Sequence, residues 1–491
     1  MKFCCWHWPF DGQDGEALLK VTQRKLMERN FSLCYINGMD HEIIDFLLKY
    51  NTNAPRYTSY PPANLFHAAK DLSQIERLWR ESNALKPQNV SFYFHIPYCL
   101  KHCLFCGCTS ELLPADGSGS ERYFAALFAE MDKKLPWIDS SRPVTQVHFG
   151  GGTPTSVPFS YLERILNKLR ERFVFAPHAE IAIECNPASI DEKRLRELAK
   201  IGFNRVSYGI QDFDPQVLKN IGRDPSLLPI RDLLALSREL HFSGINLDLI
   251  YGLPSQTESG FYRSVETAAD VHPDRIALYS YAHVPWLKEA QKTLERFAMP
   301  TPHEKLSFFL GAREIFKKAG FMDVGMDHFV DPADSLAIAL SQGLLHRNFQ
   351  GYCTRATTGE VYAFGSSGIS QLDNAYLQNV HESRKYVELV EANAMTEIRC
   401  EELSYEERVI RDVIERLMCN RRLAVSDEEK RVVGAGWDRL LDLEKDKLIV
   451  KKSENEMEAT ELGTLVIRYL AMQLDPLMRN AQREGVFSKT I

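Results

Sequence analysis

Apolar runs typical of β-strands recur along the middle of the chain, and amphipathic stretches separate them. The runs begin near Ser91, Val144, Glu180, Arg205, Ile245 and Asp274. The stretches between them repeat apolar residues every three or four positions, as in residues 161–173 (YLERILNKLRERF) and 230–240 (IRDLLALSREL). Six strand-plus-helix units in sequence predict an α/β fold with a parallel sheet and right-handed crossovers.

Polar residues and glycines stand at the carboxyl ends of these predicted strands. In chain order they are Cys99, the run 150–155 (GGGTPT), Glu184, Gln211, Asp248 and residues 281–283 (YAH). A barrel gathers all such ends on one face, where enzymes of this architecture place their sites. A doubly wound sheet would spread them along an edge. The pattern therefore favours a partial, open (β/α)6 barrel.

The pattern changes on both sides of this core. We predict an unassigned extension over residues 1–38, an N-terminal arm over 39–90, the core with a flanking segment over 91–370, and a mainly helical domain over 371–491. The tract PRYTSYP in the arm should be extended, because a residue before proline avoids the helical conformation. Long amphipathic segments and a β-like pair (LIVKK and EMEAT) make the last domain winged-helix-like.

Composition narrows the class of protein. Hydrophobic content of 44% and charged content of 25% are those of an ordinary globular protein. The net charge of −7 gives no support for general nucleic-acid binding. No secretory signal and no uncharged apolar run of about 18 residues are visible. Eleven cysteines, four of them within ten residues, indicate a reduced compartment. A cytoplasmic enzyme is the simplest interpretation.

The four clustered cysteines are Cys99, Cys103, Cys106 and Cys108, and the first three have the spacing C-x3-C-x2-C. A tetrahedral zinc site draws on two separated knuckles, and no second knuckle appears in the chain. Three thiolates in one loop fit three corners of a [4Fe-4S] cluster, whose fourth iron would be open to a small molecule. Structural zinc, or a loop without metal, is the alternative.

The glycine run and two carboxylates suggest ligand contacts. GGGTPT lacks the features of a P-loop or a Rossmann turn, but consecutive glycines let the backbone approach a ligand closely. A simple tight turn is the alternative. Glu184 and Asp248 lie in apolar strands, where a carboxylate is costly unless it is paired or bound to a ligand. Either one could instead bond a neighbouring helix.

These motifs carry a family resemblance. C-x3-C-x2-C after a strand resembles the signature of radical S-adenosylmethionine (SAM) enzymes, and the string from HIPYC to CGC resembles the oxygen-independent coproporphyrinogen III oxidase branch. The resemblance covers residues 39–491, which makes Met39 a candidate start of the protein. It implies that Cys99, Cys103 and Cys106 bind the cluster, that Cys108 does not, and that SAM chelates the open iron.

The resemblance also implies two SAM molecules and their contacts. The first would meet Tyr93, the glycine run (Gly151, Gly152 and Thr153) and Glu184. The second would meet Phe105, Cys108, Gln211, Arg223 and Asp248, while Ala282 and Ile369 would supply backbone or packing contacts. Two departures from the family pattern are a loop one residue longer after Tyr352, with Cys353 in it, and the pair Cys185-Asn186 beside Glu184.

The implied activity is that of an oxidoreductase in haem biosynthesis, which converts coproporphyrinogen III to protoporphyrinogen IX without oxygen. Flavodoxin or ferredoxin would be the electron donor, the protein would be a monomer, and the C-terminal domain would cap the substrate. Arg56 and Arg347 are candidate partners for the substrate carboxylates. The alternatives are a haem-degrading radical SAM enzyme and a haem chaperone, which generally lacks the fourth cysteine and the strings RYTSYP and NFQGY.

Overall fold

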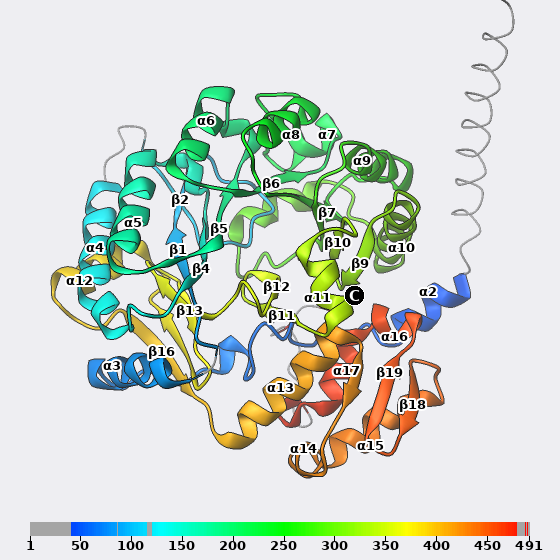
Figure 1. Ribbon diagram of the computed structural model, residues 1–491. Helices are drawn as coiled ribbons and strands as arrows, with labels where there is room; N and C mark the ends of the chain where they lie inside the picture. The colour runs from blue at the N-terminus through cyan, green and yellow to red at the C-terminus, as the bar shows by residue number, and fades with distance from the viewer. Residues whose placement is uncertain (1–40, 86, 115–119, 479–486, 488, 490–491) are drawn as a thin grey trace, which may run out of the picture.

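The computed structural model describes residues 41–85, 87–114, 120–478, 487 and 489. The predicted extension over residues 1–38 and the candidate start Met39 lie outside the described residues. The largest element is one twelve-stranded sheet with the order β16-β15-β14-β13-β1-β4-β5-β6-β7-β8-β10-β9. The sheet curves into a barrel with helices outside the curve (Figure 1). The barrel is open because its two edge strands do not pair with each other.

The six predicted strands are neighbours in the sheet and are all parallel. They are β1 (Val90–Ile96), β4 (Val144–Gly151), β5 (Phe175–Cys185), β6 (Arg205–Gln211), β7 (Gly244–Tyr251) and β8 (Arg275–Ser280). The main intervening helices are α4 (Ser120–Lys134), α5 (Phe159–Arg172), α6 (Glu192–Ile201), α8 (Ile230–Glu239) and α9 (Glu258–Asp270). The predicted α/β fold with a partial (β/α)6 barrel is confirmed.

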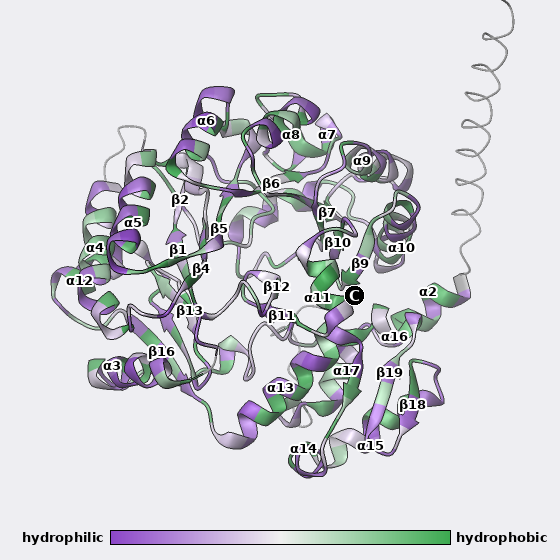
Figure 2. Ribbon diagram, in the orientation of Figure 1, coloured by the Kyte–Doolittle hydropathy of each residue, from purple (hydrophilic) through white to green (hydrophobic). Residues whose placement is uncertain are grey.

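Successive side chains of the barrel strands point alternately to the core and to the site. In β1, Phe92 and Phe94 are fully buried and Phe94 stacks on Phe149 with ring centroids 5.2 Å apart. Tyr93 and His95 point to the opposite face, because successive side chains of a strand alternate. The apolar face of the strand therefore packs under the helices. The helices carry both hydrophilic and hydrophobic stretches (Figure 2). The polar face, with Tyr93 and His95, lines a cavity inside the barrel.

The sheet is wider than predicted. A seventh parallel strand, β13 (Glu360–Phe364), pairs with β1, and antiparallel strands extend both edges. These are β14 (Ile369–Gln371), β15 (Ala375–Asn379) and β16 (Glu397–Glu402) on one side, and β10 (His328–Val330) and β9 (Met322–Gly325) on the other. The boundary predicted at residue 370 therefore falls inside β14. Strands such as β15 (AYLQN) are buried at every position, so no alternation marks them in the sequence.

Mainly helical structure begins at α13 (Tyr405–Asn420), where Ser404 and Glu407 form a reciprocal capping box. The other elements of this part are β17 (Arg422–Ala424), α14 (Asp427–Val433), α15 (Ala435–Leu441), β18 (Ile449–Ser453), β19 (Glu456–Ala459), α16 (Glu461–Leu465) and α17 (Ile467–Leu474). The strands form a small antiparallel sheet in the order β17-β19-β18. This part therefore combines helices with a β-hairpin, and its winged-helix-like character stays a prediction.

Two connections join this helical part to the barrel. The hairpin of β11 (Leu345–Asn348) and β12 (Gly351–Thr354) lies within the curve of the barrel in Figure 1, and Tyr352 donates a hydrogen bond to the Met418 carbonyl of α13. The N-terminal arm, which begins with α2 (His41–Leu48), has no helix over residues 54–62. Arg468 of α17 donates to the carbonyls of Ala54 and Pro55. The arm therefore runs between the two parts.

A buried ion network ties α4 to the antiparallel side of the sheet. Lys134 Nζ lies 2.6 Å from carboxylate oxygens of both Glu130 and Glu397, and Tyr386 donates to Glu130 over 2.6 Å. Lys134→Met should lower the free energy of unfolding by about 3–5 kcal/mol, because two buried carboxylates lose their cation. Urea unfolding measures this, with the exposed Lys200→Met as control. Equal stability of both variants would contradict the expectation.

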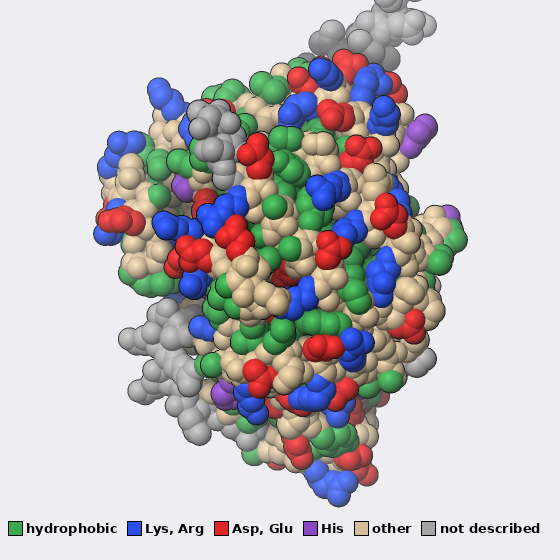
Figure 3. All heavy atoms as spheres, turned by 90° about the vertical axis from the view of Figure 1, so that its left-hand side faces the viewer, with side chains coloured by type: hydrophobic (Ala, Val, Ile, Leu, Met, Phe, Trp, Pro, Cys, Tyr) green, Lys and Arg blue, Asp and Glu red, His purple; other side chains and the backbone are tan. Residues whose placement is uncertain are grey.

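The outer surface shows no dominant charge on the face in view. Lys and Arg side chains are interspersed with Asp and Glu there (Figure 3). Among the described residues, no helix is long and apolar enough to cross a membrane.

Candidate active site

The glycine run after β4 brings two strand ends together. A Cβ at Gly152 would lie 2.8 Å from the carbonyl oxygens of both Pro97 and Tyr98, and one at Gly150 would lie 2.7 Å from Glu184 Oε1. Gly151 has φ +120°, a conformation that favours glycine. The glycines therefore permit close approach to the cysteine loop and leave room for the Glu184 carboxylate.

The cysteine loop starts at β2 (Tyr98–Cys99) and returns at β3 (Glu111–Leu112), which pairs with β2. Cys99 is buried, Cys103 and Cys106 are half-buried, and Cys108 is exposed. Cys99 Sγ lies 3.4 Å from Thr153 Oγ1, and Arg223 Nη1 lies 3.3 Å from Cys103 Sγ. Burial raises the pKa of Cys99, and its neighbours Cys106 and Cys103 raise it further. The three predicted ligands thus lie close to one another.

Three thiols lie on the loop that runs from β2 to β3, and three thiols are a donor set of the kind that holds an iron–sulfur cluster. Within the described ranges, no three His, Cys, Asp or Glu side chains are placed to hold a metal ion. The cluster therefore stays a prediction, with structural zinc as its alternative.

Glu184 has two hydrogen-bond partners on the neighbouring strand β4. Its Oε1 lies 3.1 Å from His148 Nε2, and its Oε2 accepts a hydrogen bond from the Gly151 backbone N–H over 3.2 Å. Burial opposes its charge, but these two bonds outweigh burial and lower the pKa of Glu184. The side chain is therefore held as an anion.

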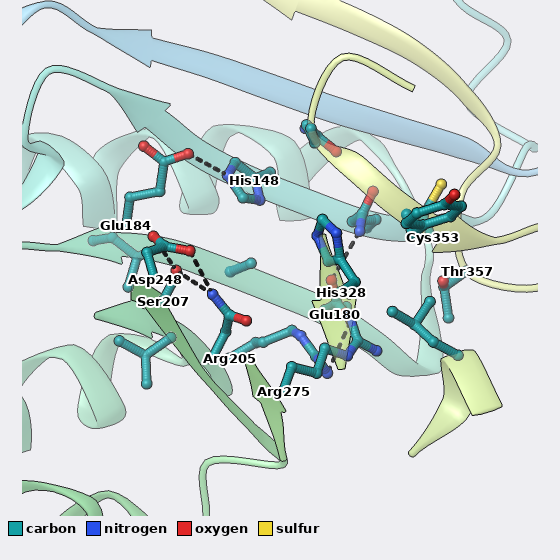
Figure 4. A pocket seen from close by; sticks show the side chains of 18 of the residues that line it. His148, Glu180, Glu184, Arg205, Ser207, Asp248, Arg275, His328, Cys353 and Thr357 are labelled. Carbon is teal, nitrogen blue, oxygen red and sulfur yellow. Dashed lines mark hydrogen bonds and ion pairs between the residues drawn. The ribbon is translucent and has the colours of Figure 1, made fainter. Parts of the chain in front are cut away.

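The pKa of Asp248 is shifted in the opposite direction to that of Glu184. Ser207 donates to Asp248 over 3.0 Å and Asn246 over 2.8 Å, but burial and the nearby charge of Glu184 raise the pKa of Asp248 to about 6. Figure 4 shows Asp248 beside Glu184 at one end of a cavity. Two neighbouring carboxyl groups with pKa values shifted in opposite directions are common at functional sites.

Two cavities meet at Glu184. The first, of about 130 Å³, runs from Glu184 and Asp248 to an ionic group of Glu180, Arg205 and Arg275 (Figure 4). The second, of about 250 Å³, is lined by five predicted site residues together with His95 and the hairpin turn. Those five are Tyr93, Cys108, Gly151, Glu184 and Ile369. Ile369 reaches this cavity although the preceding loop departs from the family pattern.

The predicted residues on β6 and after it also converge. Arg223 donates to the carbonyl of Gly209, and the Gln211 side chain approaches the same glycine. Gln211 has φ 71°, so the strand ends in a strained turn at this position. Arg223 therefore joins the end of β6 to Cys103 of the cysteine loop.

The segment after β8 packs on the cysteine loop through one amide. Gln291 Nε2 donates to the carbonyls of Phe105 over 3.0 Å and Ala282 over 3.2 Å. Lys288 Nζ donates to the Cys108 carbonyl over 2.8 Å. Phe105 and Ala282 are thereby brought to the same part of the site.

The sequence interpretation missed several residues of the site. His148 and His95 face the interior and contact Glu184 and Tyr93, respectively. His148 lies two residues before Gly150, and His95 lies two residues after Tyr93. Residues two apart on a strand share a face, and this signal could have found both histidines. Cys185 is buried, and Asn186 caps a short helical turn by accepting from the Ala188 N–H over 3.1 Å. This departure therefore has a local structural role.

A parallel partial barrel with a three-cysteine loop on its first strand and carboxylates on later strand ends characterises radical SAM proteins. The family model described as the Radical SAM superfamily matches residues 93–268.

At the finer level, the chain belongs to the oxygen-independent coproporphyrinogen III oxidase family. It is 36% identical over 456 residues to the oxygen-independent coproporphyrinogen III oxidase of Escherichia coli, which covers 90% of this chain and 97% of that protein. The relative of that name from Synechocystis is 34% identical, with 91% and 97% covered. A solved coproporphyrinogen III oxidase from Escherichia coli, described as a radical SAM enzyme, superposes with a TM-score of 0.79 at 34% identity over 86% of this chain and 97% of that one.

Proposed function

We propose that the protein converts coproporphyrinogen III to protoporphyrinogen IX by oxygen-independent oxidative decarboxylation in haem biosynthesis. One observation carries the proposal: relatives of that name match nearly their whole length, including the arm and the C-terminal part. A radical SAM core alone would not distinguish substrates, because many activities share one fold.

In this proposal Cys99, Cys103 and Cys106 hold a [4Fe-4S] cluster, and Tyr93, Glu184 and residues 151–153 hold the SAM on its open iron. When bound, the two groups would supply one-electron chemistry that removes a hydrogen atom from a propionate; carbon dioxide then leaves, one electron passes to an acceptor outside this chain, and a vinyl group remains. The protein holds Glu184 as an anion through His148 and Gly151, so this carboxylate can accept from a donor on SAM.

A second SAM is part of the proposal. Phe105, Cys108, Gln211, Arg223 and Asp248 would contact it, with Ala282 and Ile369 as packing contacts. The larger of the two cavities that meet at Glu184 is lined by residues assigned to both SAM molecules, and Asp248 lines the smaller one. We further propose a monomer in the cytoplasm that receives electrons from flavodoxin or ferredoxin.

Binding at Asp248 should depend on pH. A ligand group that donates a hydrogen bond needs the ionised carboxylate, and the pKa of Asp248 is about 6. Affinity should therefore be full above pH 7 and fall by up to about tenfold per unit below pH 6, as the side chain gains a proton. Anaerobic calorimetry from pH 5 to 8 measures the second SAM equivalent. Asp248→Asn should show weak, pH-independent binding; a wild-type profile in this variant would contradict the assignment.

The activity test starts with anaerobic reconstitution with iron and sulfide. Incubation with SAM, dithionite and coproporphyrinogen III should give protoporphyrinogen IX and carbon dioxide. If haem is consumed and no protoporphyrin forms, the protein is a haem-degrading enzyme. A stable haem complex without SAM cleavage would identify a haem chaperone.

A further inference from the structure

Arg347 has an unsatisfied guanidinium group inside the protein. It lies on β11 with 3% of the residue exposed, and among the described residues its Nη1 has no hydrogen-bond partner. Its Nε donates to the Arg56 carbonyl over 3.3 Å, and its guanidinium carbon lies 4.7 Å from the centre of the Tyr352 ring. A buried donor without an acceptor is unfavourable, so this N–H lacks a partner of the kind that a ligand oxygen would supply.

Arg56 lies next to Arg347 and is held by Asp327. Arg56 Nη2 forms an ion pair with Asp327 Oδ2, and His328 Nδ1 lies 2.7 Å from Asp327 Oδ1. The Arg56 side chain is still 39% exposed, so part of its guanidinium group faces open space. Burial opposes the charge of Asp327, but Arg56, His328 and Arg347 together lower its pKa.

The cluster has more positive than negative charge. Arg468 joins it and donates to the backbone carbonyls of Ala54, Pro55 and Lys489. Burial, together with the charges of Arg56 and Arg347, lowers the pKa of Arg468 to about 9. The charge of Asp327 raises the pKa of Arg56 and opposes the lowering of the Arg468 pKa, and burial raises the pKa of the nearby Asp475.

The cluster contacts residues that line the cavity at Glu184 and Asp248. Tyr352, which packs against Arg347, and His328, which contacts Asp327, both line that cavity. Tyr279 also lines the cavity. Burial and the charges of Asp248 and Asp327 raise the pKa of Tyr279, and the opposing effect of Arg56 is smaller. Figure 4 shows His328 on the cavity wall.

We propose that Arg347 and Arg56 bind a carboxylate of the substrate, and that Asp327 positions Arg56 for this contact. The inference rests on the proposed function, since coproporphyrinogen III carries four propionates. A planar guanidinium group is suited to paired hydrogen bonds with a carboxylate. Because Arg56 belongs to the arm and Arg347 to the hairpin, the contact joins two segments that the sequence separates widely.

The two arginines that line the cavity itself, Arg205 and Arg275, have more carboxylate partners, although Arg205 Nη2 also lacks a hydrogen bond among the described residues. Arg275 Nε lies 2.9 Å from Asp334 Oδ2, and Arg205 lies 3.4 Å from Glu180 and 3.6 Å from Asp334. Two cations here face two carboxylates, so their charges are balanced. Arg56 has an ion pair with Asp327, whereas Arg347 has no ion pair among the described residues, which leaves charge for a ligand.

The test uses reconstituted protein with Arg347→Gln, Arg347→Lys and Arg56→Gln, and the exposed Arg384→Gln as control. Arg347→Gln should raise the KM for coproporphyrinogen III by about 10–100-fold through loss of a charged hydrogen bond, with a smaller change in kcat. Arg347→Lys should recover part of the affinity. Cluster absorbance and SAM cleavage without substrate should match wild type in each variant.

Direct binding separates charge recognition from general structure. Wild-type protein should bind coproporphyrin III more tightly than its tetramethyl ester in fluorescence titrations, and Arg347→Gln should reduce that preference. Equal weakening of acid and ester, or unchanged binding of the acid, would overturn the proposal. If Arg347→Gln does not fold, Arg347→Lys and Arg56→Gln decide by the same comparison. If wild-type protein makes no protoporphyrinogen, the proposed function fails, while the acid-to-ester preference still tests the arginines.

Discussion

Cys103→Ser is expected to abolish both the iron–sulfur absorbance and the turnover of the reconstituted protein. Cys103 belongs to the loop that β2 and β3 close, and Arg223 donates to its thiol. Removing one of three thiolates leaves too few ligands for a cluster that already lacks a fourth cysteine. Activity should fall to background.

Cys108→Ser should behave differently. Cys108 is exposed, its backbone N–H donates to Cys106 Sγ over 3.4 Å, and its side chain lines the cavity with Tyr93 and Ile369. The variant should keep the cluster absorbance and lose part of its activity, because it changes a proposed SAM contact rather than a cluster ligand.

Iron analysis and visible spectra measure both variants after anaerobic reconstitution. Wild-type protein and the control Cys400→Ser, a buried cysteine on β16, should bind about four irons per chain. If Cys103→Ser and Cys108→Ser lose iron to the same extent, Cys108 is a cluster ligand and the division into three ligands and one SAM contact is wrong.

Most of the barrel could be predicted from the sequence because each of its six strands has a recognisable local sequence pattern. Each is an apolar run that ends in glycine or polar residues, and an amphipathic helix follows. β13 has no such context: its five residues are all buried, and its partner β1 lies far away in the chain. Pairing between distant segments is set by the packed sheet, so local pattern did not reveal it.

Some residues of the candidate site could be predicted from the sequence, and others depend on how the strands pair. Cys99 and Glu184 stand at the carboxyl ends of β2 and β5, so the predicted topology places them on one face of the barrel, whereas Asp248 lies inside β7. The partner of Glu184 depends on register: β4 and β5 pair His148 with Ala182, which places the His148 ring near the Glu184 carboxylate. A one-residue shift would turn these side chains to the other face.

The two arginines show what only the structure could separate. Arg56 and Arg347 looked equivalent as candidate carboxylate partners in the sequence. Arg56 has an ion pair with Asp327, whereas Arg347 keeps a buried N–H without an acceptor. The difference arises where the arm, β11 and the start of β10 come together.

Glu184→Gln is expected to weaken SAM binding by about 100-fold or more. The carboxylate accepts from His148 and Gly151 at the same time, and an amide has one acceptor oxygen for these two donors. A hydrogen bond to a charged group contributes about 1.5–3 kcal/mol, and an unsatisfied buried donor adds to the loss. The anionic charge offered to SAM is lost as well.

Glu180→Gln is the matched control, since Glu180 lies on the same face of β5 at the other end of the cavity. It should keep SAM affinity and lose stability, because Arg205 lies 3.4 Å from its carboxylate. Equilibrium dialysis with labelled SAM and the rate of reductive SAM cleavage separate the two variants. Binding by Glu184→Gln within a few-fold of wild type would show that SAM does not depend on this carboxylate, and the first SAM would then have to be placed elsewhere along the two cavities.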